Sequence, residues 1–181
     1  VGPLGWGIQT GAGPVHTRLR PKFGSSLAVF GCGTVGMSAI MAARIAGCQT
    51  IIAVGGNPAS LELARELGAT HTINRKETED IVAAIKDLTH GGVHYAIDTT
   101  GVGDFVRKAL ASCRFMGTAV VLGATGDLTI NVQAELMGDA KSLIGIVEGD
   151  AVSKLFIPKL LEYYRAGQFP FDRLIKFYDF K

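Results

Sequence analysis

Apolar runs and helical patterns alternate along this chain of 181 residues. Runs rich in β-branched and apolar side chains predict strands over residues 27–30, 50–54, 70–74, 93–98, 118–122 and 142–147. Apolar positions at helical spacing predict helices over residues 37–46, 61–67, 78–88, 104–112 and 153–166. Strands separated by helices form βαβ units, which are wound right-handed and build a parallel sheet. The pattern therefore predicts an α/β fold, a doubly wound parallel sheet with helices on both faces.

A glycine-rich turn joins the first predicted strand to the next helix. Gly31, Gly33 and Gly36 have the spacing G-x-G-x-x-G. The first glycine permits a tight turn, the second lets the backbone approach a pyrophosphate, and the third lets the helix pack closely on the strand. Thr34 and Val35 lie within this motif and are candidate cofactor-binding residues, and the helix that follows aims its free N–H groups and positive dipole end at the anion. Because a strand precedes this motif and a helix follows it, the sequence predicts a Rossmann-type fold that binds a dinucleotide.

Composition gives no reason to expect a nucleic-acid or membrane partner. Apolar residues make up 48% of the chain, charged residues 19%, and the net charge is +2, which is ordinary for a globular protein. No apolar run approaches the ~18 residues of a membrane span, and the first residues lack the pattern of a secretory leader. We therefore expect a cytoplasmic protein.

The cysteines and histidines predict neither a disulfide framework nor a metal site. Cys32, Cys48 and Cys113 are odd in number and lack C-x-x-C spacing, so we expect buried free thiols. The histidines are scattered without ligand spacing, and we interpret all four as surface or strand-end residues: His16, His71, His90 and His94.

The end of the second predicted strand bears on the choice between NAD and NADP. A Rossmann site for NAD carries an acidic residue there, which binds the ribose 2′-hydroxyl, but this chain has Gly55, Gly56 and Asn57. A 2′-phosphate would meet no repelling carboxylate, so NADP is slightly favoured within an NAD(P) site. Arg75, just past the third strand, is the nearest counter-charge in the sequence. The equally good alternative is that Arg75 is a solvated loop residue beside Lys76.

Segments in order along the chain carry a resemblance that covers nearly its whole length. They are GIQTGAG from residue 7, VFGCG from 29, LELARELGATH from 61, VEGD from 147 and GQFPFD from 167. This series resembles the cofactor-binding domain of the medium-chain, zinc-dependent alcohol dehydrogenases, most of all their aryl- or benzyl-alcohol branch. The resemblance implies hydride transfer between a nicotinamide dinucleotide and a small alcohol or aldehyde, with zinc polarising the oxygen.

The resemblance also implies a domain layout. We expect one dinucleotide-binding domain over residues 1–181: a linking helix and connection over 1–20, a Rossmann core over 27–150, and a C-terminal helix and strand over 151–181. In the family, a catalytic domain precedes this part and the chain later returns to it. We therefore expect the chain by itself to be inactive.

One residue departs from the family pattern. Trp6 stands where the family has a cysteine that binds the catalytic zinc, and an indole cannot ligate zinc as a thiolate does. We therefore expect no zinc and no catalytic residue in this chain, and the simplest interpretation of Trp6 is an apolar residue packed near a helix start. Trp6 also favours the runner-up function, a zinc-independent quinone or enoyl reductase. A dinucleotide-binding module without catalytic activity is a third possibility.

Further cofactor-binding residues follow from position. Residues at the carboxyl ends of parallel strands line the ligand crevice, and by similarity these are Thr99, Thr100, Gly101, Leu122, Gly123 and Ala124. The resemblance adds Ile146, Val147 and Glu148 at the carboxamide and Thr10 at the nicotinamide ring. For Leu122 and Ile146, core packing is the alternative. Asp98 is acidic at a strand end, and its side chain could cap the following turn.

The resemblance also suggests an assembly. Residues 128–132, from Leu128 to Val132, alternate inward and outward side chains like the family's edge strand, through which two cofactor domains join. An uncovered edge is otherwise an aggregation hazard. We therefore expect a homo-dimer or tetramer through this edge and the nearby strand at 142–147.

Overall fold

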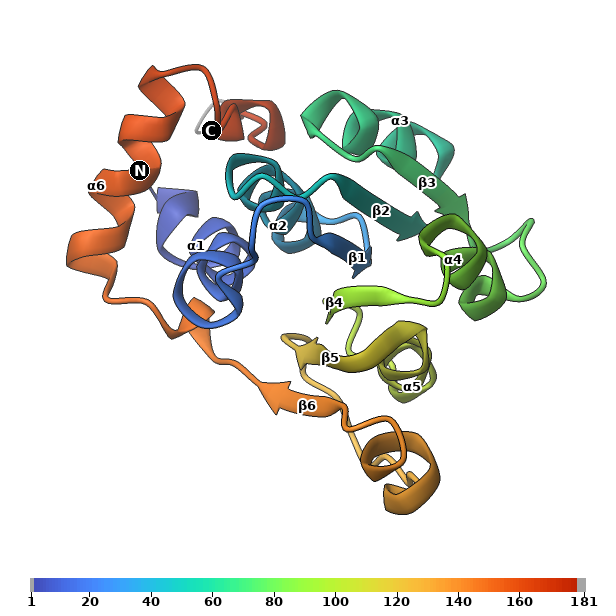
Figure 1. The fold of residues 1–181 in the computed structure, drawn as a ribbon. Helices are drawn as coiled ribbons and strands as arrows, with labels where there is room; N and C mark the ends of the chain where they lie inside the picture. The colour runs from blue at the N-terminus through green and yellow to red at the C-terminus, as the bar shows by residue number, and fades with distance from the viewer. Residues whose placement is uncertain (1, 179–181) are drawn as a thin grey trace.

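One parallel sheet organises the computed structural model, which describes residues 2–178 (Figure 1). The strand order in the sheet is β3-β2-β1-β4-β5-β6. The strands are β1 (Ser26–Phe30), β2 (Thr50–Gly55), β3 (His71–Asn74), β4 (Val93–Asp98), β5 (Cys113–Val121) and β6 (Ser142–Gly145). Each neighbouring pair is parallel. The order reverses between β1 and β4, as in dinucleotide-binding sheets, so the predicted Rossmann-type fold is confirmed.

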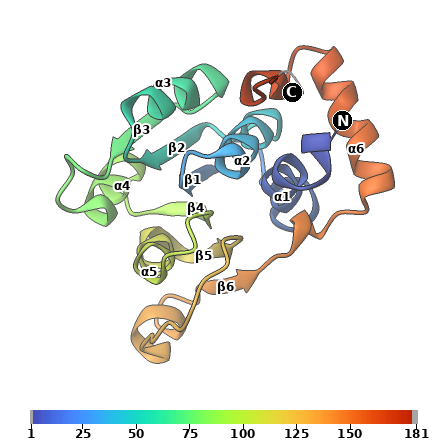
Figure 2. The ribbon, with the colours of Figure 1, turned by 180° about the vertical axis from the view of Figure 1, so that it is seen from behind.

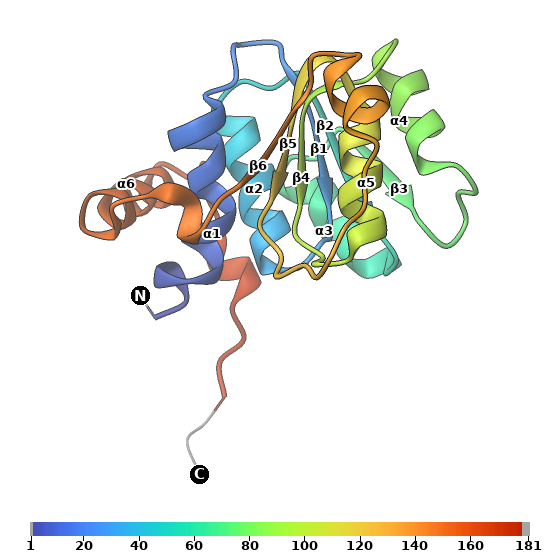
Figure 3. The ribbon, with the colours of Figure 1, turned by 90° about the horizontal axis from the view of Figure 1, so that it is seen from below.

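Helices cover both faces of this sheet (Figures 2 and 3). The longer ones are α1 (Gly7–Gly13), α2 (Thr34–Ile45), α3 (Pro58–Leu67), α4 (Ile81–Thr89), α5 (Gly103–Ser112) and α6 (Ser153–Arg165). Shorter turns are η1 (Gly2–Gly5), η2 (Pro14–Leu19), η3 (Val132–Met137), η4 (Glu148–Asp150) and η5 (Phe171–Leu174). The turn η2 continues α1, so helical backbone runs from Gly7 to Leu19.

The core has two halves, one on each face of the sheet. Val29 and Ile51 pack with α1, α2, α3 and α6, whereas Phe30 and Ile52 pack with α4 and α5. Successive strand side chains point to opposite faces, and both faces are covered. This explains why the strands are continuous apolar runs without polar alternation.

Side-chain caps set the helix boundaries. The Asn57 carboxamide oxygen accepts a hydrogen bond from Ala59 N (2.9 Å) and starts α3, which ends at Gly68 with φ +131°. The Asp80 carboxylate accepts from Ala83 N (2.9 Å), so α4 begins at Ile81 and not at the predicted residue 78. A cap satisfies N–H groups that the first helical turn leaves free, and this decides the boundary.

Two predicted strands are wrong. Residues 128–131 are irregular and Val132 begins η3, because the Asn131 side chain caps Ala134 N (3.0 Å) and the Glu135 carboxylate accepts from Asn131 N (2.7 Å). These side-chain bonds favour a turn over a strand, so β6 is the edge strand next to β5, and β3 is the opposite edge. In the C-terminal part, η5 and irregular backbone occupy residues 171–178 in place of a strand, and residues 179–181 lie outside the described part.

His16 is partly buried by aromatic side chains, which differs from the predicted surface or strand-end position. Its ring stacks on Tyr163 at 5.6 Å and meets the edge of Phe156 at 5.8 Å, because α6 folds back over η2. The cysteines are free as expected, with Cys48 and Cys113 buried and Cys32 partly buried. Among the described helices, none is long and apolar enough to span a membrane.

Candidate functional site

The glycine turn after β1 has the geometry that its spacing predicts. Gly31 has φ +102°, and a Cβ there would lie 2.3 Å from Thr99 Oγ1, which donates to Phe30 O (2.9 Å). A Cβ on Gly36 would lie 1.9 Å from Gly31 O, so this glycine lets α2 pack against the turn. A Cβ on Gly33 would meet nothing within 4 Å. The space above Gly33 is thus open for a ligand.

The start of α2 faces that open space. Gly33 is its N-cap in extended conformation and has no side chain to satisfy the first N–H groups. Thr34 and Gly33 are exposed and Val35 is partly exposed. Free N–H groups and the positive end of a 12-residue helix bind anions such as a pyrophosphate.

A cavity of about 220 Å³, the first cavity below, lies on one side of this turn. It brings together Gly31, Gly55, Gly56, Asn57, Arg75 and Thr100 from the predicted set. Of the described residues, none that lines it carries a carboxylate. The register pairs Gly55 with Asn74, so Arg75 emerges beside the end of β2. The cavity therefore contains the guanidinium of Arg75 and no carboxylate among its described lining residues.

Five residues that line this cavity are outside the predicted set: Phe30, Cys32, Val54, Ser60 and Phe105. Cys32 fills the space over Gly55: its Sγ would lie 2.9 Å from a Cβ on that glycine and contacts Val54 O at 3.6 Å. Burial raises the pKa of the Cys32 thiol to about 11, so the group is neutral at physiological pH. Phe105, near the start of α5, forms another wall. In the sequence, an apolar residue in a predicted helix indicates core packing and does not indicate a ligand cavity.

Asp98 at the end of β4 shapes the turn that follows. Its fully buried carboxylate accepts hydrogen bonds from Thr100 Oγ1 (2.7 Å), Thr100 N (3.3 Å) and Gly101 N (3.2 Å). The expected cap is therefore present. Thr99 and Gly101 line neither cavity and instead position Gly31 and the turn.

The second cavity lies between α1 and the carboxyl ends of β5 and β6 and has a volume of about 400 Å³. It brings together eight predicted or highlighted residues: Trp6, Thr10, Leu122, Gly123, Ala124, Ile146, Val147 and Glu148. Ile146 is buried and Leu122 partly buried, so both contribute to the core as well as the wall. Trp6 is 75% exposed. It therefore stands at the rim, and the interpretation of a packed indole is wrong because η1 ends just before it.

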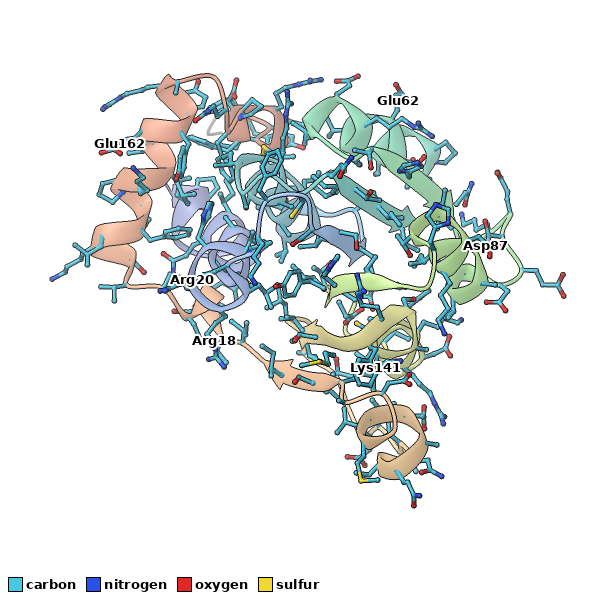
Figure 4. All side chains as sticks on the ribbon, in the orientation of Figure 1. Arg18, Arg20, Glu62, Asp87, Lys141 and Glu162 are labelled. Atoms are coloured by element: carbon cyan, nitrogen blue, oxygen red, sulfur yellow. The ribbon has the colours of Figure 1, made fainter. Side chains whose placement is uncertain are left out.

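Helix α1 and its continuation η2 position the second cavity through contacts with the loop after β6. Gln9 Nε2 donates to Glu148 O (3.1 Å), and Thr17 Oγ1 donates to Gly149 O (2.9 Å). Arg18 pairs with Asp150, and its position near α1 is marked in Figure 4. A Cβ on Gly11 would lie 1.9 Å from Val35 O, so α1 also packs closely on α2. Gln9 and Thr17 lie more than 130 residues from their partners, so no local sequence pattern predicts these contacts.

The described residues do not form a zinc site. Residues 2–178 contain no group of three or more His, Cys, Asp or Glu side chains arranged to hold a metal ion. Trp6 offers only an indole N–H, which is a donor. A zinc ion needs at least three protein ligands, so the residues present do not fit one.

The fold and the glycine turn define a dinucleotide-binding domain. Comparison with known proteins gives the family: residues 34–162 match the family model described as zinc-binding dehydrogenase. The chain belongs to this family.

Three relatives illustrate the similarity. A geraniol dehydrogenase from Castellaniella defragrans is 42% identical over 99% of this chain, which covers 49% of that protein. The benzyl alcohol dehydrogenase structure from Acinetobacter calcoaceticus has a TM-score of 0.94 at 43% identity, over 98% of this chain and 49% of the other. A zinc-binding-domain alcohol dehydrogenase structure from Burkholderia ambifaria has the same TM-score at 50% identity, over 98% and 48%. The chain thus spans about half the length of these relatives and corresponds to their Rossmann half.

Proposed function

We propose that the chain binds a nicotinamide dinucleotide across the carboxyl ends of its strands. The adenosine would occupy the first cavity, the pyrophosphate the turn at Gly33, and the nicotinamide the second cavity. The observation that carries this proposal is the open Gly33 and the free start of α2 between two cavities.

Within that proposal, Arg75 supports a preference for a 2′-phosphate. Arg75 lines the same cavity as Gly55. Gly55 stands where the family's NAD-binding members have an acidic residue. A charge-assisted hydrogen bond contributes about 1.5–3 kcal/mol, or roughly ten- to hundredfold in affinity. NADPH should therefore bind more tightly than NADH by about this factor.

For the whole protein we propose hydride transfer between a nicotinamide dinucleotide and an alcohol or aldehyde, with an aryl alcohol as the first candidate, in the cytoplasm. The bound nicotinamide supplies the hydride chemistry. The residues of this chain bind and orient it: Thr10 and Leu122 form walls, and Gln9 fixes the loop at Glu148. Trp6 favours one second candidate, a reductase of the same superfamily that works without zinc.

Calorimetry on the 181-residue chain with NADH and NADPH tests the binding proposal. We expect both nucleotides to bind and NADPH to bind more tightly, with a preference that shrinks in high salt because Arg75 is exposed. The variant Arg75→Ala should level the two affinities, and Lys76→Ala is the matched control. If neither nucleotide binds, the proposed function is wrong; if both bind equally, only the 2′-phosphate preference is wrong.

We also propose a two-fold dimer, now through β6. Ile146 N donates to Val121 O (3.2 Å), and backbone N–H groups alternate along a strand, so the Gly145 N–H points away from β5. Sedimentation should show a dimer, and Gly145→Pro should dissociate it because proline lacks the N–H. A monomer at high micromolar concentration would contradict this proposal.

A further inference from the structure

Arg75 is held from two sides by different elements. A Cβ on Gly56 would lie 2.8 Å from Arg75 Nε and 3.3 Å from Cζ, so the guanidinium lies directly against the end of β2. On the other side, Arg75 Cζ lies 5.7 Å from the centroid of the Phe105 ring. The guanidinium thus occupies a slot between Gly56 and Phe105.

The Phe105 ring is itself held in place. It packs on Phe30 with the centroids 6.3 Å apart, and Lys108 Nζ lies 5.3 Å from its centroid. Lys108 is paired with Asp104 at 2.6 Å. Two cations therefore meet one aromatic ring, and the electron-rich ring face attracts each of them.

No carboxylate competes for Arg75 among the ion pairs of residues 2–178. An exposed arginine is ordinarily mobile, and fixing it on an anion costs rotamer entropy. In this chain the Gly56–Phe105 slot restricts the side chain before any anion arrives. A pre-organised guanidinium loses less freedom when it binds.

We propose that Phe105 is a positioning residue that sets cofactor specificity by holding Arg75 where the 2′-phosphate of the dinucleotide lies. This inference rests on the proposed function. Phe105 would raise the affinity for the 2′-phosphate indirectly, by holding Arg75, in addition to lining the cavity.

The experiment is calorimetry on the 181-residue chain with two small probes, adenosine 2′,5′-bisphosphate and AMP. The readout is the ratio of their affinities. An exposed cation–π contact corresponds to about two- to fivefold, so Phe105→Leu should reduce the ratio by about this factor. The ring-preserving variant Phe105→Tyr should keep the ratio, and so should Phe23→Leu, which changes a 92% exposed phenylalanine outside the cavity. In an Arg75→Ala background, Phe105→Leu should change the ratio no further.

Gly56→Ala tests the same slot from the other side, because its Cβ would displace Arg75 Nε. Gly56→Ala should also lower the ratio of the two affinities, and it replaces Phe105→Leu as the test if that variant does not fold. An unchanged ratio in a folded Phe105→Leu chain, or an equal loss for both probes, would overturn the role of Phe105 and leave the proposed function intact. If the unsubstituted chain binds AMP but shows no preference for the bisphosphate, both the 2′-phosphate preference and this inference fail.

Discussion

Gly55→Asp is the substitution that should convert the cavity to NADH, and the structure predicts that it fails by itself. A Cβ on Gly55 would lie 2.9 Å from Cys32 Sγ and 3.2 Å from Leu61 Cδ2. Gly55 is buried, so the crowding cannot be relieved into solvent. Overpacking of this kind costs about 1–3 kcal/mol. We expect Gly55→Asp to lower the free energy of unfolding by this amount and to gain little NADH affinity.

The partner substitution Cys32→Ala removes the sulfur that causes the crowding. Because its raised pKa keeps the thiol neutral, Cys32 acts on position 55 through packing. The double variant Cys32→Ala/Gly55→Asp should regain most of the lost stability, with a coupling energy of about 1–2 kcal/mol in a double-mutant cycle. Its new carboxylate can then accept bonds from the ribose 2′-hydroxyl, which should shift preference toward NADH roughly ten- to hundredfold.

Chemical denaturation and calorimetry with both nucleotides measure these two effects. Gly55→Ala is the control, because it adds the Cβ without the charge and should show the packing cost alone. The reasoning is refuted if Gly55→Asp is as stable as the unsubstituted chain and switches preference without Cys32→Ala.

Three further predictions concern the glycine turn, the pH dependence of stability and metal content. Gly36→Ala should destabilise the fold by several kcal/mol, on the order of the largest single-substitution effects, because its Cβ would lie 1.9 Å from Gly31 O. Gly33→Ala should keep the melting temperature and weaken dinucleotide binding, because a Cβ there meets nothing within 4 Å. Melting curves and calorimetry that show the opposite pattern would contradict the conclusion that the space above Gly33 is open. Burial, with Lys159 nearby, lowers the pKa of His16 below its ordinary value of 6.5, so the unfolded state binds the proton first and stability should fall as pH drops below about 6.5. His16→Phe should flatten this part of the pH profile of unfolding more than the control His90→Asn, and equal profiles would contradict the prediction. The purified chain should hold no stoichiometric zinc and should not oxidise benzyl alcohol, and Trp6→Cys should not change either result in metal analysis and nicotinamide absorbance, because one thiolate does not make a three-ligand site.

The fold could be predicted because its signals are local. Apolar runs, helical spacing and the glycines at 31, 33 and 36 each specify a neighbouring element, and βαβ handedness then restricts the topology. Residues 128–132 show the limit of such signals. Their alternation is genuine, but the Asn131 cap and the Glu135 carboxylate direct the backbone into a turn.

The candidate site was predictable where it follows from strand ends and not where it depends on side-chain packing. The cavity at Gly55 and Arg75 combines residues that the sequence brings to one edge of the sheet. Cys32 and Phe105 enter the same cavity through their directions in space, which sequence spacing does not reveal. Tertiary contacts such as that of Gln9 with Glu148 depend on where α1 docks, and only the folded chain shows this.

The contacts of α1 with the loop after β6 have a consequence for the order in which the chain acquires its cavities during synthesis. The residues that line the first cavity all lie before residue 106, so its walls have left the ribosome while much of the chain is still to be made. The second cavity needs Trp6 and Thr10 together with residues as far along the chain as Glu148. The contacts of Gln9 and Thr17 can form only after residues more than 130 positions later have been synthesised, and closing so long a loop is slow. A nascent chain would form the first cavity early and the second cavity last.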